Sequence, residues 1–390
     1  MKSTEFWRAT ISFDFDTPID RHDTASLKWA KYEGRDIIPM WVADMDFRSP
    51  PAVIEALHQR VAHGVFGYTT ALEELIETII STLQRDYGWE IESDWIVWLP
   101  GLVTGLSVTC RAIGDDGDDV LTTVPVYPPF LSAPKYSRRN LLTVPLAEVD
   151  GRWVFDFDRL ESAITPRTRL FILCNPHNPA GRVFNREEIS ALVEICRKHD
   201  IIICSDEIHC GLVLDEDKNH LPTATLSAEI ADRTITLMAP SKTFNVPGLG
   251  CSFAIISNPE LRKSFRRAAS GIVPFVNALG YTAALAAYRD SAQWHRELLN
   301  YLRDNRNMVE HSIAEIPGLY MNHVEATYLA WIDMRSSGIQ DPLKFFEDAG
   351  VGLSDGAQFD GPGFLRLNFG CPRSTLGEAL ERMQKAMSRV

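Results

Sequence analysis

Long apolar runs are missing from this sequence, and no stretch reaches the roughly 18 consecutive apolar residues typical of a membrane-spanning helix. The segment from Met1 to Arg8 has no apolar core behind its charged residues, so it does not have the pattern of a secretory signal. We therefore expect neither membrane insertion nor export.

Paired cysteines are also lacking. The seven cysteines are odd in number and include no C-x-x-C pair. Most of them lie within apolar strand or helix patterns: Cys110, Cys174, Cys196, Cys204 and Cys251. Reduced, buried thiols in a cytoplasmic protein fit this distribution best. The one cluster of metal-ligand type lies at residues 206–210, and because such clusters are more often structural we expect no metal site.

A net positive charge is absent as well, since 39 Lys and Arg residues against 52 Asp and Glu residues give a formal net charge of −13 over 390 residues. A local basic patch at 262–267 lies on a predicted helix, where a solvated helix face is the favoured interpretation. We therefore expect no nucleic-acid partner. With 45% hydrophobic and 23% charged residues the composition is that of an ordinary globular protein, and the length favours two domains.

Strand and helix patterns alternate from residue 95 onward. We expect strands at 95–99, 120–124, 170–174, 201–205 and 234–238, and helices at 102–113 and 186–199. The second helix has a capping-box pattern, with Glu188 three residues after Asn185. This alternation predicts an α/β fold with a mainly parallel, helix-flanked sheet. A further strand at 250–256 follows so closely that an antiparallel return is expected.

The flanking segments differ from this pattern. Residues 1–45 form an irregular arm, followed by a helix that Ser49 can cap and Gly64 can end, and by a helix at 72–87. Beyond residue 275 the chain turns helical, and strands at 327–333 and 364–369 with helices at 342–349 and from 374 predict a small α+β domain. We expect an N-terminal arm (1–45) that packs on the small domain, a large domain (46–285), and a small C-terminal domain (286–390) that begins with a long connecting helix.

Polar side chains follow three of the predicted strands. Lys242 comes after 234–238, Asp206 after 201–205 and Asn178 after 170–174. In an open α/β sheet, ligands bind beyond the carboxyl ends of the strands, so these groups should meet at one edge. A lysine there can form a Schiff base if its site disfavours the ammonium form. Each residue also has a structural interpretation: Lys242 on the surface or as a cap, Asp206 as a cap or ion pair, and Asn178 as a turn residue.

Further groups leave the same edge. Tyr127, in a proline-rich turn, could stack on a flat heterocycle or equally pack in the core. The loop at 101–105 opens a helix whose free amides attract anions, although its glycines could serve turn geometry alone. His209 could reach the same ligand. One ligand would satisfy all of these groups if it carried a phosphate, a pyridine ring, a phenolic oxygen and an aldehyde. Pyridoxal 5′-phosphate (PLP) has all four features.

In this combination and order, the residues resemble the fold-type-I PLP-dependent enzymes, the aspartate aminotransferase superfamily, over nearly the whole chain. The resemblance implies a large domain with a mainly parallel sheet and helices on both faces, plus a smaller α+β C-terminal domain. It also implies that Lys242 forms the Schiff base with the cofactor. The other cofactor contacts that it implies are Asp206 at the pyridine nitrogen, Asn178 at the ring oxygen, Tyr127 stacked on the ring, and Leu102, Val103 and Ser241 at the phosphate.

Two further residues gain a role only from this resemblance. Tyr68, within 66–69, matches a tyrosine that members of the superfamily send into the neighbouring subunit's site, which implies a homodimer. Arg366, within 364–370, matches the arginine that grips the substrate α-carboxylate, a role that suits its planar two-donor fork.

One departure narrows the resemblance. Superfamily aminotransferases commonly carry a phosphate-binding arginine eight residues after the lysine, and Gly250 stands at that position here. The segments 41–47, 126–130, 205–210 and 241–245 resemble a branch that shares this gap, the MalY/PatB-type cystathionine β-lyases or C-S lyases. Ala180, where threonine is usual, and Gly211, where aspartate is common, are local departures that touch no proposed catalytic group.

This branch implies a PLP-dependent carbon–sulfur β-lyase. Such an enzyme eliminates a thiol from L-cystathionine or a related S-substituted L-cysteine and leaves pyruvate and ammonia. Lys242, Asp206 and Tyr68 are the expected catalytic residues. A class I/II aminotransferase is the nearest alternative, because it shares the chemistry up to removal of the Cα proton. A non-catalytic, PLP-sensing regulatory protein is a further alternative, although the acidic chain has no spare segment for a DNA-binding domain.

Overall fold

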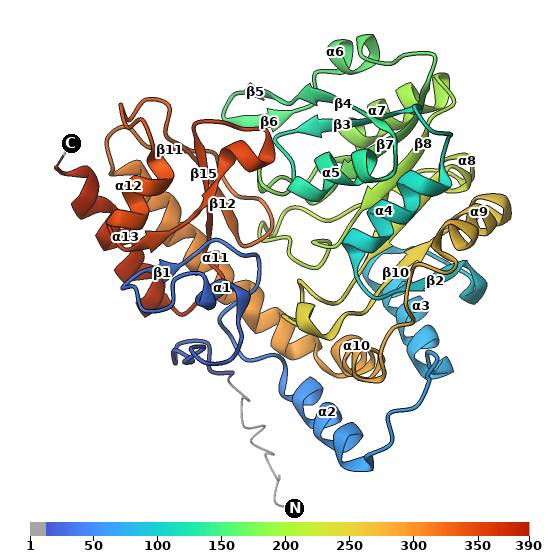
Figure 1. Ribbon diagram of the computed structural model, residues 1–390, viewed down its shortest axis with the longest axis horizontal. Coiled ribbons are helices and arrows are strands. Elements are labelled where there is room, and N and C mark those ends of the chain that lie inside the picture. The colour runs from blue at the N-terminus through green and yellow to red at the C-terminus, as the bar shows by residue number, and fades with distance from the viewer. Residues whose placement is uncertain (1–12, 390) are drawn as a thin grey trace, which may run out of the picture.

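The computed structural model describes residues 13–389, and a seven-stranded sheet forms the centre of its larger part (Figure 1). The strand order is β2-β10-β9-β8-β7-β3-β4. The strands are β2 (Ile96–Leu99), β3 (Asp119–Val124), β4 (Asn140–Pro145), β7 (Thr168–Cys174), β8 (Ile202–Asp206), β9 (Thr234–Met238) and β10 (Ser252–Ile255). Neighbours from β9 to β4 pair in parallel, whereas β10 is antiparallel to both β2 and β9. The predicted parallel sheet and its antiparallel return are therefore confirmed.

Helices cover both faces of this sheet because successive side chains of a strand point to opposite sides. In β7, Leu170 and Ile172 join one apolar core, while Phe171 and Leu173 join another. The first core also holds residues of α4 (Leu102–Ala112), α5 (Pro128–Tyr136) and α9 (Pro259–Ala269). The second core holds residues of α6 (Phe157–Ser162), α7 (Arg186–Lys198) and α8 (Ala228–Asp232). This layered arrangement is the expected fold-type-I architecture.

Three more helices pack together beside the sheet: α2 (Pro51–His63), α3 (Glu73–Tyr87) and α10 (Ala278–Asp290). As predicted, α2 ends at Gly64, where φ is 77°. The expected cap of this helix is wrong. Pro50 occupies the N-cap position, and the Ser49 hydroxyl instead donates to the Asn245 carbonyl oxygen at 2.9 Å. Ser49 therefore ties the start of α2 to the loop that follows Lys242.

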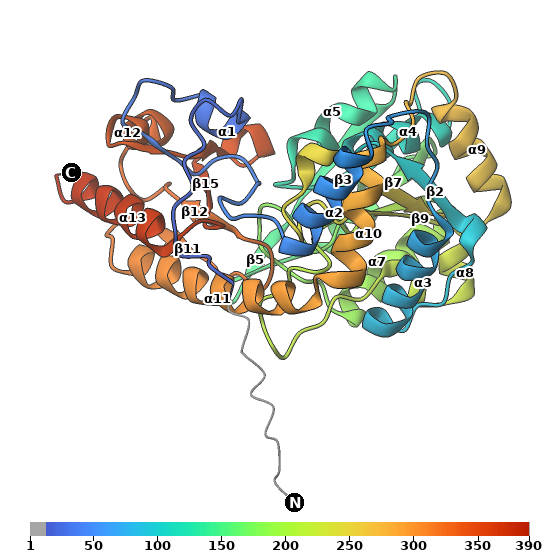
Figure 2. The ribbon, with the colours of Figure 1, turned by 90° about the horizontal axis from the view of Figure 1, so that it is seen from below.

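A second, smaller part contains a four-stranded antiparallel sheet in the order β11-β12-β15-β14. Its elements are α11 (Ala292–Ala314), β11 (Tyr320–Met321), β12 (Leu329–Asp333), α12 (Pro342–Asp348), β13 (Val351–Gly352), β14 (Ser354–Asp355), β15 (Phe364–Asn368) and α13 (Arg373–Met387). The long helix α11 runs from the larger part to the smaller one (Figure 2). The three domain boundaries given above stay a prediction.

From residue 13 on, the arm before α2 lies beside this smaller part (Figure 2), and just after α1 (Leu27–Ala30) the side chains of Lys31 and Tyr32 contact Glu347 of α12. Strand β1 (Ile38–Pro39) pairs in parallel with β13. The structure also contains β4 and the hairpin of β5 (Ala147–Val149) and β6 (Arg152–Val154), none of which the sequence patterns predict. No helix within residues 13–389 is both long and apolar enough to cross a bilayer.

A buried ionic cluster joins the two parts. Arg182, in the loop after β7, donates through Nε to Glu325 Oε2 at 3.0 Å and through Nη2 to both oxygens of Glu188. Glu325 precedes β12 and also accepts from Arg152 Nη2 at 2.7 Å and from the Val183 amide at 3.0 Å. Arg182 and Glu325 are nearly inaccessible to solvent, so each needs the other to offset its lost hydration.

We predict that Glu325→Ala destabilises the protein by about 3 kcal/mol, because it leaves a buried guanidinium with one carboxylate partner in place of two. The measurement is urea-induced unfolding followed by circular dichroism. Glu194→Ala is the matched control, since Glu194 pairs with Arg197 on the exposed surface and its loss should leave the midpoint unchanged. Equal midpoints for the two variants would contradict the stabilising role of the cluster.

Candidate active site

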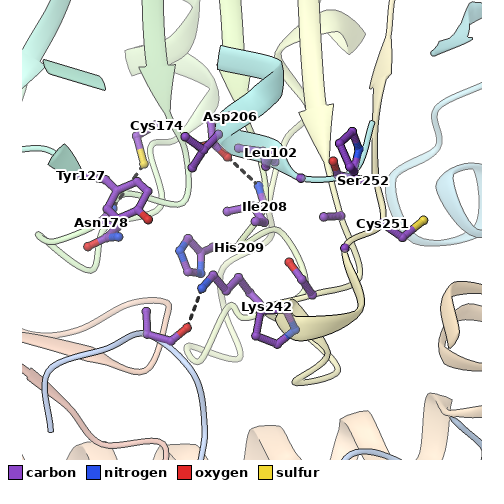
Figure 3. A pocket seen from close by; sticks show the side chains of 18 residues that line it. Leu102, Tyr127, Cys174, Asn178, Asp206, Ile208, His209, Lys242, Cys251 and Ser252 are labelled. Carbon is purple, nitrogen blue, oxygen red and sulfur yellow. Dashed lines mark hydrogen bonds between the residues drawn. The ribbon is translucent and has the colours of Figure 1, made fainter. Parts of the chain in front are cut away.

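A pocket opens at the carboxyl ends of β7, β8 and β9, where the sequence analysis expects the site (Figure 3). Its lining residues include Ala43, Gly101, Leu102, Val103, Tyr127, Cys174, Asn178, Asp206, Ile208, His209, Ser241, Lys242, Gly250 and Ser252. The cavity volume is about 180 Å³. A cavity that holds a single water needs roughly 10 to 15 Å³ by the same measure, so this space admits a ligand much larger than a water molecule. The pocket therefore brings together nearly all the residues that the sequence places at this edge.

Lys242 extends into the pocket from the turn after β9. Its Nζ donates to the backbone carbonyl oxygen of Ala43 at 2.5 Å (Figure 3). Burial lowers the pKa of this amine from its ordinary value to about 8. Asp44 and Asp206 act in the opposite direction, and Arg366 adds to the lowering. Roughly a tenth of the amine is therefore uncharged at pH 7, far more than at the ordinary pKa of lysine, and a nucleophilic lysine needs this neutral form.

Asp206 is the last residue of β8 and is almost fully buried at the pocket wall. Burial raises the pKa of its carboxyl group to about 7, against the effect of the Ile208 amide, which donates to Oδ1 at 3.1 Å. The nearby charge of Glu207 raises the pKa further, and Lys242 lowers it. Among residues 13–389, no cation pairs directly with this carboxylate. The site therefore has room for a cationic ligand group next to Asp206.

Asn178 lies in the loop after β7, where the Asn175–Pro176 and Asn178–Pro179 bonds are both cis. Its side-chain oxygen accepts from Arg366 Nη1 at 3.0 Å, and this contact fixes the orientation of the amide. No hydrogen bond from Asn178 Nδ2 is present within the described part of the chain, so this nitrogen is available as a donor. The hydrogen bond from Arg366 thus orients the Asn178 amide at the site.

Arg366 comes from β15 in the smaller part and contacts Asn178, although it does not itself line the cavity. Nη2 donates to the Trp41 carbonyl oxygen at 2.7 Å, and Nε is buried without a partner among residues 13–389. The ring of Phe359 lies 4.7 Å from the guanidinium carbon. Burial lowers the pKa of Arg366 to about 10, which leaves it cationic at neutral pH. It can therefore attract an anionic group at the junction of the two parts.

The remaining pocket walls suit a flat anionic ligand. Tyr127 presents an aromatic ring at the start of α5, and Leu102 and Val103 form the first turn of α4. Gly101 precedes this turn, so the free backbone amides of the helix start face the pocket. Ser241 also lines the cavity. A phosphate could bind at this helix start without a cationic side chain.

Gly250 also lines the pocket, and its backbone explains why no arginine stands there. Its φ is 58°, a conformation that disfavours residues with a side chain. A Cβ atom at this position would lie 2.9 Å from the Pro100 carbonyl oxygen, immediately before the anion-binding turn. A side chain at position 250 would therefore require the 100–103 loop to move.

His209 lines the pocket as expected, and its Nδ1 is buried without a hydrogen-bond partner among the described residues. Burial, together with Lys242 and Arg366, lowers the pKa of His209 to about 3, so the ring is neutral. Its neighbour Glu207 has a structural role, because its carboxylate contacts His220 Nε2 at 2.8 Å and accepts from Ser205 Oγ at 2.8 Å. Within residues 13–389, no His, Cys, Asp and Glu side chains group as metal ligands.

Tyr68 is the one expected site residue that a single chain does not bring near the pocket. Its side chain is fully exposed, in a segment where Val65, Phe66 and Leu72 are also largely exposed. The catalytic role given to Tyr68 therefore depends on a second subunit and stays a prediction.

Two residues at the site have no assigned role in the sequence patterns. Ala43 supplies the carbonyl oxygen that holds Lys242, and the Tyr328 hydroxyl donates to the same oxygen at 2.9 Å. Ala43 belongs to the segment 41–47, which the sequence resemblance includes without a function. A backbone acceptor leaves no trace in residue type, so the contact itself could not be predicted.

Comparisons with known proteins agree with this geometry. The family model described as aminotransferase class I and II matches residues 35–383. Cystathionine β-lyase PatB of Bacillus subtilis is 39% identical, covering 96% of this chain and 100% of PatB. The solved structure of a protein named OvoB has a TM-score of 0.95 at 46% identity, covering 97% of this chain and 100% of that one.

A second solved structure, the PLP-bound C-S lyase of Staphylococcus hominis, has a TM-score of 0.91 at 33% identity over 97% of this chain and 99% of that one. The predicted fold class and the resemblance to the MalY/PatB-type branch are thereby confirmed. This chain belongs to the aminotransferase class I and II family.

Proposed function

We propose that this protein is a PLP-dependent carbon–sulfur β-lyase that acts on L-cystathionine or related S-substituted L-cysteines. The main structural support is the position of Lys242 and Asp206 in one buried pocket beside the start of α4. An amine of lowered pKa, a carboxylate without a cationic partner and a neutral anion-binding turn are the groups that PLP requires. PatB and the Staphylococcus hominis protein, both named as lyases, support the choice of reaction within the family.

The residues fit the cofactor group by group. Lys242 would hold the aldehyde carbon of PLP. The protonated ring nitrogen would be the cationic partner of the Asp206 carboxylate, which has none among residues 13–389. Asn178 Nδ2 and His209 would meet the ring oxygen, and Tyr127 would stack on the ring. The first turn of α4, with Leu102 and Val103, and Ser241 would hold the phosphate. When bound there, PLP supplies an electron sink for negative charge at the substrate Cα.

The chain's own groups then perform binding and proton transfer. Arg366 binds the substrate α-carboxylate and so fixes the Cα–H bond relative to Lys242. The free Lys242 amine takes the Cα proton as general base, and Asp206 keeps a proton on the ring nitrogen. The Cβ–S bond breaks with its electron pair on sulfur, so a thiolate leaves, and the Lys242 ammonium can give it the proton that makes it a thiol. Water converts the remaining fragment to pyruvate and ammonia.

We also propose that the protein is a homodimer in which Tyr68 enters the site of the other subunit. The support is the exposure of Tyr68 together with Val65, Phe66 and Leu72, since such an apolar surface is usually covered in a stable assembly. A cytoplasmic location is part of the same proposal. It is supported by seven free cysteines, six of them buried.

The reaction is tested by incubating the holoenzyme with L-cystathionine in the absence of any keto acid. We expect continuous formation of pyruvate, ammonia and homocysteine over many turnovers, measured by coupled lactate dehydrogenase and thiol assays. An aminotransferase would give no more than one equivalent of product with a lasting change in the cofactor spectrum. That outcome would reassign the reaction while leaving the cofactor site intact.

We predict that Asp206→Ala lowers kcat roughly 100- to 1,000-fold, because the charge that stabilises the electron-poor ring is removed. Some PLP should still bind, as measured by absorbance of the purified protein. Asp119→Asn is the matched control, since Asp119 is a buried carboxylate at the opposite end of a strand and bonds to Thr165. Near-normal turnover by Asp206→Ala would contradict the role of this carboxylate.

The shared site is tested by mixing two inactive variants, Lys242→Ala and Tyr68→Ala, under conditions that allow subunit exchange. If each site uses Lys242 of one subunit and Tyr68 of the other, a mixed dimer contains one intact site. Half of the dimers would be mixed, so we expect recovery of roughly a quarter of the wild-type activity. No recovery despite proven exchange would place Tyr68 outside the partner's site.

A further inference from the structure

The backbone of residues 41–44, here called the strap, runs between the larger and smaller parts, and Ala43 within it lines the pocket. Each of its four consecutive carbonyl oxygens accepts hydrogen bonds from side chains of distant segments. The donors are Arg366 and Ser354 to Trp41, Asn368 to Val42, Lys242 and Tyr328 to Ala43, and Asn368 and Lys28 to Asp44. The strap is thus fixed from both sides, and its carbonyl groups cannot turn away from the site.

We propose that Tyr328 is a positioning residue that controls the basicity of Lys242 through their shared acceptor, the carbonyl oxygen of Ala43. The base role of Lys242 rests on the proposed function given above. The geometric basis is the pair of contacts to one oxygen, 2.5 Å from Lys242 Nζ and 2.9 Å from the Tyr328 hydroxyl. The sequence patterns give Tyr328 no function.

Tyr328 is well placed to keep this contact permanently. It is 1% exposed and stands immediately before β12, and its own carbonyl oxygen accepts from the Phe369 amide at 2.9 Å. Burial raises the pKa of its hydroxyl group, and the charge of Asp44 raises it further. The hydroxyl therefore stays protonated and remains a donor over the whole working pH range.

The shared acceptor matters because a carbonyl oxygen has two lone pairs and a limited capacity to stabilise positive charge. A hydrogen bond from an ammonium group to a carbonyl stabilises the charged form and so raises the pKa of the amine. The Tyr328 hydroxyl uses part of that capacity. It thereby weakens the bond to the Lys242 ammonium and favours the neutral amine that can accept a proton.

Other charged groups also face Lys242 and set the background. Asp44 on the strap and Asp206 on β8 favour its ammonium form, whereas Arg366 on β15 disfavours it. His209 is neutral because burial lowers its pKa to about 3. Asp206, with a pKa of about 7, titrates close to the lysine and would contribute to any pH–rate profile. The amine itself must therefore be titrated directly.

The test compares wild type with Tyr328→Phe, first as PLP-free protein. The rate at which acetic anhydride modifies Lys242 is measured from pH 6 to 11 by mass spectrometry of the peptide that contains it. Loss of the competing hydroxyl should raise the midpoint by roughly half to one pH unit, the equivalent of one ordinary hydrogen bond. Tyr301→Phe is the control, because Tyr301 is also buried but donates to Asp16, and its midpoint should not move.

The same variant is then examined as holoenzyme. If the pKa of the amine is raised, Lys242 becomes protonated, and so stops acting as a base, at a higher pH as the pH falls. The acid limb of the kcat profile should therefore move to higher pH. Turnover by Tyr328→Phe should fall at pH 7 and recover toward wild type at pH 9. This recovery distinguishes altered basicity from a damaged site, which would lower kcat at every pH.

An unchanged or lowered modification midpoint in Tyr328→Phe would overturn the proposal, and so would an equal rise in Tyr301→Phe. If the midpoint rises only in Tyr328→Phe but wild type eliminates no thiol, the control of Lys242 basicity stands and the proposed function fails. If elimination proceeds and the midpoint does not move, the reverse holds.

Discussion

The whole site depends on the desolvation of two opposite charges at the ends of neighbouring strands. β8 and β9 pair in parallel, so Asp206 at the end of β8 and Lys242 in the turn after β9 come out at the same edge of the sheet. Burial opposes the charged form of each group, and it brings their pKa values toward one another, to about 7 and about 8. The sheet thereby holds both an amine that can be neutral and a carboxyl group whose ionised form a cationic ligand would stabilise. Few arrangements of one lysine and one aspartate on a protein surface could do both.

The second requirement is that the substrate-binding arginine reaches this edge from a different part of the molecule. Arg366 lies on β15 of the smaller sheet, and its hydrogen bonds to the strap and to Asn178 connect it to the pocket. The strap is itself anchored by buried charges next to it, since Asp46 bonds to Lys28 at 2.7 Å and to Arg21 at 2.6 Å. Burial alone would raise the pKa of Asp46, but Lys28, Trp29 and Arg21 hold it below its ordinary value. Hydrogen bonds to both parts and the ion pairs beside it therefore hold the strap in place.

Sequence patterns predict the sheet well because its strands are buried on both faces and flanked by clear turn signals. The run Thr234–Met238 is found as β9 with the same bounds, and the capping box at Asn185 is present. Such patterns do not predict the edge strand β4, because only one of its residues is buried. Within the site, the side chains that come directly after a predicted strand can be placed from their position in the sequence. The Ala43 carbonyl and its two donors are not, since they depend on how segments about 200 and 285 residues apart in sequence meet.

Backbone packing explains why position 250 is a glycine, in addition to the absence of a phosphate-binding arginine there. Its left-handed φ of 58° lets the chain turn back into β10, and its backbone packs below the Pro100 carbonyl group. Gly280 on α10 fits against the same turn, where a Cβ would lie 2.6 Å from the Leu249 carbonyl oxygen and 3.2 Å from that of Gly250. Two glycines thus let α10, the turn and the start of α4 approach one another closely. An arginine at 250 would separate these elements, so close packing of the anion-binding turn and a cationic side chain at this position exclude each other. The phosphate of a bound cofactor would then be held by backbone amides and hydroxyl groups, which orient it by geometry and leave the positive charge of the site to Lys242 and Arg366.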